Sequence, residues 1–167
     1  MSEQVSLNEK ILTRYAEGVN RLDELLSGLS ESGLDLSRDQ GKWTIRQIVH
    51  HIVDAEDLWE TFIKAALGNP GYTVDMNWYI LDNKCAPLLD YARRPIKDGV
   101  ELFRAIRRHI VELVKCLPDA WGRFAAVSWS GIVDGKTFKV GDVIGFQCSH
   151  LEHHIKQIRE TRDKHGV

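Results

Sequence analysis

Four long segments of the 167-residue chain repeat apolar residues at alternating spacings of three and four, which is the period of one helix face. They cover about residues 7–29, 44–67 and 95–117, and a last stretch from residue 140 to near the C-terminus. A helix with one apolar face must bury that face against other elements, so the segments predict a helical bundle. Because no repeat, low-complexity tract or linker divides the chain, we expect a single domain over residues 1–167.

Local signals predict where the helices begin. Ser6 and Glu9 have the spacing of a capping box, so we expect the first helix to start there. Thr44 and Gln47 repeat that spacing at the start of the second helix. Pro95 suits the first turn of the third helix, where its missing N–H needs no partner.

The connections differ in kind. Residues 30–42 are polar and predict a loop, whereas residues 72–94 predict a long connection with a short helical turn, folded over one end of the bundle. Residues 124–129 and 136–139 are rich in aromatic and β-branched residues and flank the turn pair Asp134-Gly135, which predicts a β-hairpin. The predicted fold is therefore all-α, a four-helix bundle with a small β-hairpin before the last helix.

Charge and apolar runs exclude several functional classes. The net charge is −2 with both signs interspersed, which gives no basic face for nucleic acid and no polybasic membrane patch. No apolar run approaches the ~20 residues of a membrane span, and the N-terminus lacks a signal-peptide pattern. The scattered cysteines Cys85, Cys116 and Cys148 fit a reducing compartment and are expected to be plain buried or half-buried thiols. We therefore expect a cytoplasmic protein with no nucleic-acid or membrane partner.

The last helix carries three of the seven histidines within five residues. Positions four apart lie one turn apart on the same face, so the imidazoles of His150 and His154 can converge on one point at the border of the apolar stripe. His153 falls on the charged side of the helix and is expected to face solvent.

The second helix carries the doublet His50-His51. His51 lies about 70° from the centre of the apolar stripe and can face a neighbouring helix, whereas His50 lies nearly opposite and is expected to face water. Since a zinc-type ion takes at least three protein ligands, the predicted metal site consists of His51, His150 and His154. A structural interpretation stays open, in which the three histidines form hydrogen bonds at a buried helix junction.

The same stretches resemble a known family. Residues 43–49 (Trp-Thr-Ile-Arg-Gln-Ile-Val), followed by His51 and by residues 54–56 (Asp-Ala-Glu), resemble the second helix of the DinB-like superfamily, including its YfiT-like members. His150 and residues 153–158, which include His154 and Gln157, resemble its late helix. The order of helices is also similar, and the resemblance covers almost the whole chain.

The resemblance implies a bundle of unusual connectivity, often a homodimer, with zinc or nickel held by three histidines. Carried over by position, these ligands are His51, His150 and His154, while His50 and His153 match no ligand position. Known members include S-transferases and isomerases that use low-molecular-weight thiols such as bacillithiol or mycothiol. Others are described only as metal-dependent hydrolases.

The predicted site allows two kinds of chemistry. Neutral imidazoles leave the full +2 charge on the ion, which lowers the pKa of coordinated water toward ~7 and also deprotonates a coordinated thiol. We expect a metal-dependent enzyme on a small-molecule substrate, with S-transfer from a thiol preferred over hydrolysis. No catalytic residue is evident beyond the metal site, so a non-catalytic metal-binding or stress-related protein is the rival prediction.

Other side chains are candidates for supporting roles. Asp54, Glu56 and Gln157 can accept hydrogen bonds from ligand rings, although the two acids can equally be solvated helix charges. Three tryptophans are candidates to line a substrate pocket, with core packing as the alternative for the first: Trp59, Trp78 and Trp129. Four basic residues are expected on the solvated outer face of the third helix: Arg104, Arg107, Arg108 and His109.

Overall fold

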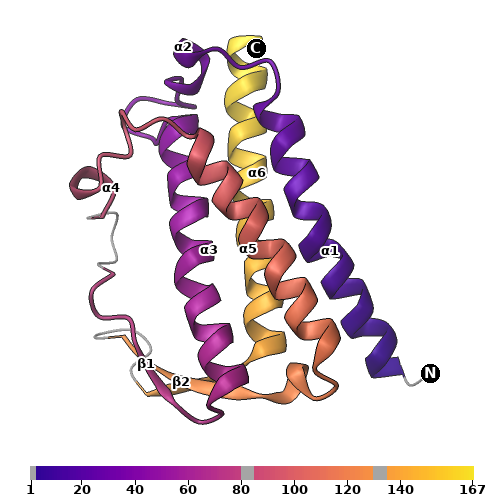
Figure 1. The fold of residues 1–167 in the computed structure, drawn as a ribbon. Coiled ribbons are helices and arrows are strands. Elements are labelled where there is room, and N and C mark those ends of the chain that lie inside the picture. Colours follow the sequence, from indigo (N-terminus) through magenta and orange to yellow (C-terminus); the bar gives the residue numbers. More distant parts are fainter. Residues whose placement is uncertain (1–2, 80–84, 130–134) are drawn as a thin grey trace.

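The computed structural model describes residues 3–79, 85–129 and 135–167. Four long helices dominate it: α1 (Glu3–Leu26), α3 (Ile45–Gly68), α5 (Lys97–Cys116) and α6 (Val140–His165). Helix α6 packs against α1 and α3, and α5 packs against the same two helices (Figure 1). The predicted four-helix bundle is therefore confirmed.

A small sheet closes one end of the bundle (Figure 1). Strands β2 (Phe124–Ser128) and β3 (Lys136–Lys139) pair antiparallel, with Ala125 opposite Phe138, which confirms the predicted hairpin. Strand β1 (Thr73–Asp75) adds to it in parallel, an addition that the sequence did not reveal. Of the predicted turn pair, Gly135 directly precedes β3 and has φ 68°, in the left-handed region. Asp134 lies outside the described residues.

The capping box at the start of α3 is confirmed. The Thr44 hydroxyl accepts the backbone N–H of Gln47 at 3.2 Å, and the Gln47 amide oxygen accepts that of Thr44 at 2.9 Å. The capping box expected at Ser6 is wrong, because α1 already begins at Glu3 and Ser6 lies within it. The residues before Ser6 are compatible with a helix and extend it by a turn.

The connections are more ordered than their composition suggested. Residues 30–42, expected to be a polar loop, include α2 (Glu31–Leu34), in which the Ser30 hydroxyl caps Gly33 and Leu34 is buried in the core. The short helical turn expected in residues 72–94 is present as α4 (Cys85–Leu88). The expected position over one end of the bundle holds for β1, which belongs to the sheet there, whereas α4 lies beside α3 toward the other end (Figure 1).

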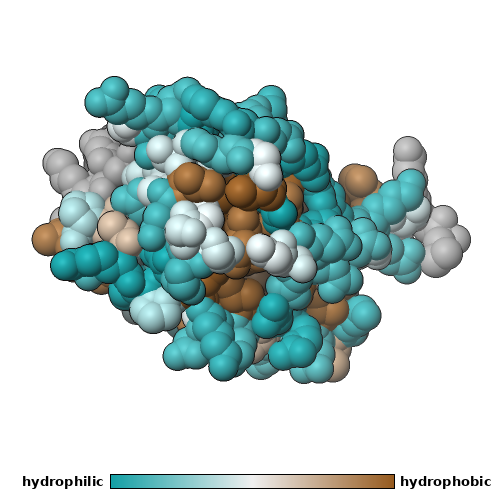
Figure 2. Space-filling view, turned by 90° about the horizontal axis from the view of Figure 1, so that it is seen from above, coloured by the Kyte–Doolittle hydropathy of each residue, from teal (hydrophilic) through white to brown (hydrophobic). Residues whose placement is uncertain are grey.

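The core consists of two apolar clusters with polar side chains between them. One lies toward the sheet and includes Phe62, Ile110 and Ile144; the other lies toward α2 and includes Leu22 and Phe103. Seen from the α2 end, apolar surface gathers in the centre and is ringed by hydrophilic side chains (Figure 2). Buried polar residues lie on α3, α5 and α6, and among them are Arg107, Glu56, Gln147 and His154.

The cysteine prediction holds for two of three residues. Cys85 and Cys148 are buried, whereas Cys116 is exposed at the C-terminal end of α5, where the bundle no longer covers it. Among the described residues, no helix is both long enough and apolar enough to cross a bilayer.

Candidate metal centre

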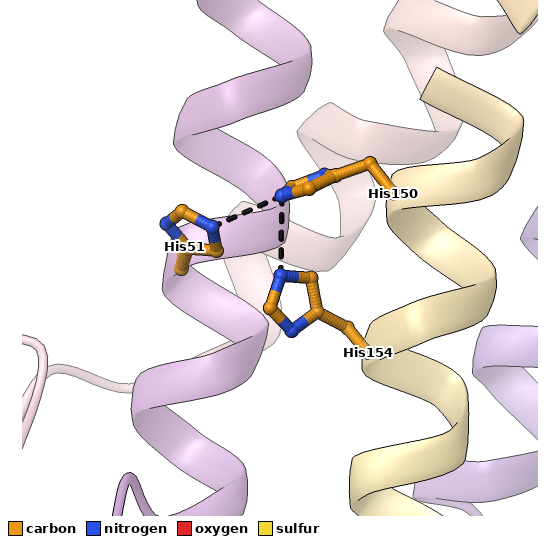
Figure 3. A group of neighbouring side chains, drawn as sticks. All are labelled: His51, His150 and His154. Atoms are coloured by element: carbon orange, nitrogen blue, oxygen red, sulfur yellow. Dashed lines mark hydrogen bonds between the residues drawn. The ribbon is translucent and has the colours of Figure 1, made fainter. Parts of the chain in front are cut away.

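Three histidine rings converge between α3 and α6 (Figure 3). The Nε2 atom of His150 lies 3.0 Å from Nε2 of His51 and 3.1 Å from Nε2 of His154. One ligand atom from each of the three residues lies within 4.8 Å of the other two. The structure thus brings together the three histidines that helical phase selected, from helices about a hundred residues apart.

Gln157 orients His154. The Nδ1 atom of His154 lies 2.8 Å from the Gln157 amide oxygen, which can only accept, so Nδ1 carries the hydrogen and Nε2 the lone pair. The Gln157 amide nitrogen in turn donates to Nε2 of the exposed His153 at 3.1 Å. Gln157 therefore occupies the supporting position proposed for it, and His153 supports the amide from solvent.

Aromatic side chains enclose the other two rings. Trp43 lies 5.0 Å from the ring of His51, and the hydroxyl of Tyr79 lies 3.4 Å from its Nδ1 atom. Phe146 stacks on His150 at 5.8 Å between ring centroids. The two rings are therefore held by contacts from three places: Trp43 before α3, Tyr79 in the 72–94 connection and Phe146 on α6.

Burial keeps the three imidazoles neutral. Desolvation, followed by the neighbouring His154, lowers the pKa of His51 to about 4. Desolvation, followed by the charges of His154 and His51, lowers the pKa of His150 to about 3. The pKa of His154 is also lowered, chiefly by burial. At pH 7 each ring therefore has a lone pair to offer a cation.

The donor set fits a divalent cation. A neutral ring nitrogen carries either one hydrogen or one in-plane lone pair, so Nε2 of His150 can form at most one well-aligned hydrogen bond with its two histidine neighbours. A cation among the three Nε2 atoms would satisfy all of them at once. Three imidazoles match the protein ligand set of catalytic zinc sites, which keep a further position for water or substrate.

A cavity of about 350 Å³ borders two of the three rings, those of His51 and His154. It is lined by Arg38, Gly41, Lys42, Trp43, Ile48, His51, His154, Gln157 and Thr161. Its size suits a small molecule. The three tryptophans expected in such a pocket are not among the described residues that line it. Trp78 is 63% exposed and Trp59 packs in the core against Phe62.

His50 does not face water, contrary to the prediction. It is 4% exposed, and its Nε2 donates to the Arg94 carbonyl at 3.0 Å while its Nδ1 accepts from the Arg94 guanidinium at 3.2 Å. Arg94, at the end of the 72–94 connection, covers this side of α3. A helical wheel drawn for α3 alone cannot reveal a contact from another segment.

Glu56 and Arg107 form a second polar cluster, and both were misplaced by the sequence reasoning. Arg107, expected on the outer face of α5, is 1% exposed and holds the Glu56 carboxylate through Nε at 3.0 Å and Nη2 at 2.8 Å. Tyr15 donates to the same carboxylate, and its carbonyl accepts from Arg107 at 2.8 Å. Glu56 is therefore neither a partner of the histidines nor a solvated charge.

A sequence signal for Arg107 did exist. It lies four residues after Phe103 and three before Ile110, which places it within the apolar stripe of α5. Trp43 and Tyr79, which also approach the histidines, gave no comparable signal. Trp43 precedes the helix, and Tyr79 lies in a stretch without periodicity.

Comparison with known proteins agrees with this architecture. The structure superposes on YfiT from Bacillus subtilis with a TM-score of 0.81 over 99% of this chain and 90% of that one, at 20% identity. YfiT is described as a probable metal-dependent hydrolase with an unusual four-helix bundle topology. Because the identity is low, this likeness establishes the fold alone.

Two curated relatives carry a similar description. A protein from Oceanobacillus iheyensis is 26% identical over 140 residues, or 84% of this chain and 76% of its own. One from Bacillus mycoides is 24% identical over 163 residues, or 95% and 90%. Each is named a "putative metal-dependent hydrolase". The model of the DinB superfamily matches residues 14–158, most of the sequence, and the chain accordingly belongs to the DinB superfamily.

Proposed function

We propose that this protein is a metal-dependent hydrolase of a small molecule, with one divalent cation held by His51, His150 and His154. The observation that carries the proposal is the convergence of three neutral Nε2 atoms beside a cavity. The names of the relatives from Oceanobacillus and Bacillus support hydrolysis over other reactions at such a centre.

The chain's own residues have defined parts in this proposal. The three histidines hold the cation, and Gln157 fixes the ring of His154. Trp43 and Ile48 form an apolar part of the cavity wall. Lys42, which is exposed, adds a positive charge to the lining. A bound zinc or nickel ion would supply Lewis acidity and an open position for a nucleophile at neutral pH.

Transfer of a low-molecular-weight thiol is the second candidate. It uses the same centre, because a cation that activates water also favours a thiolate. The specific observation in its favour is the basic lining of the cavity, where Arg38 and Lys42 suit a cosubstrate with carboxylates. Arg38 is partly committed, since it already pairs with Glu160 at 2.5 Å.

Metal analysis of the purified protein tests the centre. We expect one divalent cation per chain, lost in His51→Ala and His154→Ala. The matched control is His109→Ala, which removes an exposed histidine from α5. Unchanged metal content in the two site variants would refute the proposal.

Activity assays separate the two reactions. The metal-loaded protein is incubated with panels of small esters and amides, and separately with low-molecular-weight thiols plus monochlorobimane. Hydrolysis that disappears in His154→Ala supports the hydrolase, whereas thiol conjugation alone supports the transferase. Metal binding with neither reaction would support the non-catalytic rival.

Three further predictions remain proposals. We propose that residues 1–167 form one domain, since α1, α3, α5 and α6 share continuous packing. The homodimer implied by the family resemblance is tested by light scattering, and the cytoplasmic location by fractionation of cells.

A further inference from the structure

We propose that the cavity beside the histidines binds a small carboxylate anion with an apolar body, and that Lys42 is the residue that selects for the charge. The cavity is taken as the substrate site, so this proposal rests on the proposed function. It adds a substrate class, which applies equally to hydrolysis and to thiol transfer.

The charges in the cavity lining have one sign. The described residues of the lining include two cations, Arg38 and Lys42, and no acidic side chain. Its two histidines, His51 and His154, are neutral at pH 7, because burial lowers their pKa values. Neutral ligands would leave a bound divalent cation its full charge, which adds to that of the lining. Walls of one sign attract ions of the opposite sign, so this cavity favours an anion.

Only one of the two cations in the lining is left for a ligand. Nη1 of Arg38 lies 2.5 Å from Oε2 of Glu160, and its Nε lies 3.4 Å from Oδ2 of Asp39. The side chain of Lys42 forms no ion pair with any residue that the structure describes. A single unpaired ammonium balances one negative charge, which suits a carboxylate better than a phosphate dianion.

A tight turn holds Lys42 in place. Its backbone N–H donates to the Asp39 carbonyl at 3.1 Å, and Gly41 has φ 76°, as the third residue of a type II turn requires. The turn is fixed to the end of α6, because Nζ of Lys164 lies 2.9 Å from Oδ1 of Asp39 and donates to the Arg38 carbonyl at 2.6 Å. Lys42 therefore extends an exposed side chain from an anchored loop.

The wall beside Lys42 is apolar. Trp43 follows it directly in the chain, is half-buried, and lies 5.0 Å from the ring of His51. Ile48 is buried and completes this apolar part of the lining. Exposure thus falls from Lys42 to Trp43 and on toward the histidines. A ligand that places its carboxylate at Lys42 would lay an apolar body along Trp43 and direct its other end toward the metal centre.

Binding of two matched ligands to the metal-free protein tests the proposal, because no carboxylate can then coordinate a cation. The probes are hippurate and hippuramide, which share an aromatic ring and differ in a carboxylate against a neutral amide. We expect NMR titration to show that hippurate binds about 3–5-fold more tightly, with both ligands shifting the indole N–H signal of Trp43. Added salt should reduce the difference. Equal affinities, or no shift at Trp43 with hippurate, would overturn the proposal.

Substitution of Lys42 tests its part in the preference. Lys42→Gln should bind hippurate and hippuramide equally, whereas Lys42→Arg keeps the charge and should keep the preference. The matched control is Lys115→Gln, which removes an exposed lysine from the last turn of α5, outside the cavity lining, and should also keep the preference. A preference for hippurate that survives in Lys42→Gln would overturn the proposal.

The proposed function and the proposed substrate class fail in different ways. If the unaltered protein binds no divalent cation at the histidines, the proposed function fails, although the metal-free protein still prefers hippurate. If the metal-loaded protein hydrolyses carboxylate-bearing and neutral amides with equal kcat/KM, and the metal-free protein binds both probes equally, the substrate class alone fails.

Discussion

Two polar clusters lie in the middle of this bundle, both anchored on α3, and they are built in opposite ways. In the first, Glu56 and Arg107 neutralise each other, and Tyr15 and the Gln147 carbonyl complete the contacts, so that α1, α3, α5 and α6 all contribute. In the second, the ring nitrogens of three neutral histidines converge at the edge of a cavity.

The difference separates a structural cluster from a reactive one. The guanidinium of Arg107 also lies over the rings of Tyr15 at 4.3 Å and Phe103 at 4.6 Å, so its charge is enclosed on every side. The histidines have no such enclosure on the cavity side. One cluster thus specifies how four helices meet, while the other stays available to a ligand.

Arg107→Ala is expected to have the largest effect on stability. It leaves the Glu56 carboxylate buried without its partner, which should lower the free energy of unfolding by about 3–5 kcal/mol, as urea titration would measure. The double variant Glu56→Leu/Arg107→Met removes both charges and should recover most of the loss. A double variant as unstable as the single one would show that the pair itself, and not the orphaned charge, sets the stability.

Acid should destabilise the histidine cluster of the metal-free protein. His51 and His150 have folded pKa values of about 4 and about 3, against 6.5 unfolded, so the unfolded chain binds more protons below pH 6.5. The free energy of unfolding should therefore fall as pH drops, by about 2–3 kcal/mol between pH 7 and 5 after allowance for partial exposure. Urea titrations in chelator at both pH values measure it, and His51→Ala should reduce the fall.

Gly18→Ala probes the approach of Arg107 to α1. An added Cβ would lie 2.3 Å from Nη1 of Arg107 and 2.6 Å from Cδ2 of Leu151, so both side chains must shift, at a cost of about 1–2 kcal/mol. Gly145→Ala is the matched control, because its Cβ would meet nothing within 4 Å and should stabilise α6 by about 0.5–1 kcal/mol. Thermal unfolding distinguishes the two, and equal shifts would contradict the close approach.

His51→Ala should have the smallest effect on the folded protein. In the metal-free state at pH 7 we expect the free energy of unfolding to change by less than about 1 kcal/mol, because the ring borders a cavity and its Nε2 competes with that of His154 for one atom of His150. The same variant should lose metal. A destabilisation comparable with that of Arg107→Ala would mean that both clusters are structural.

Periodicity predicted the bundle and the three converging histidines, because both depend only on where each residue lies around its own helix. Thr44 and Gln47 set the start of α3, and the position of His51 on the wheel follows from it. The burial of His50 did not follow, since Arg94 covers it from a segment outside the helix. Tyr79 and Tyr91 reach α3 for the same reason, through a connection with no period of its own.

The cavity draws its walls from two sources with different constraints. Arg38, Gly41 and Lys42 precede α3 and lie outside both apolar clusters, whereas His51 and His154 are held within the packed helices. Residues 38–42 are therefore where natural drift or laboratory evolution can reshape selectivity at little risk to folding, leaving the chemistry of the centre intact.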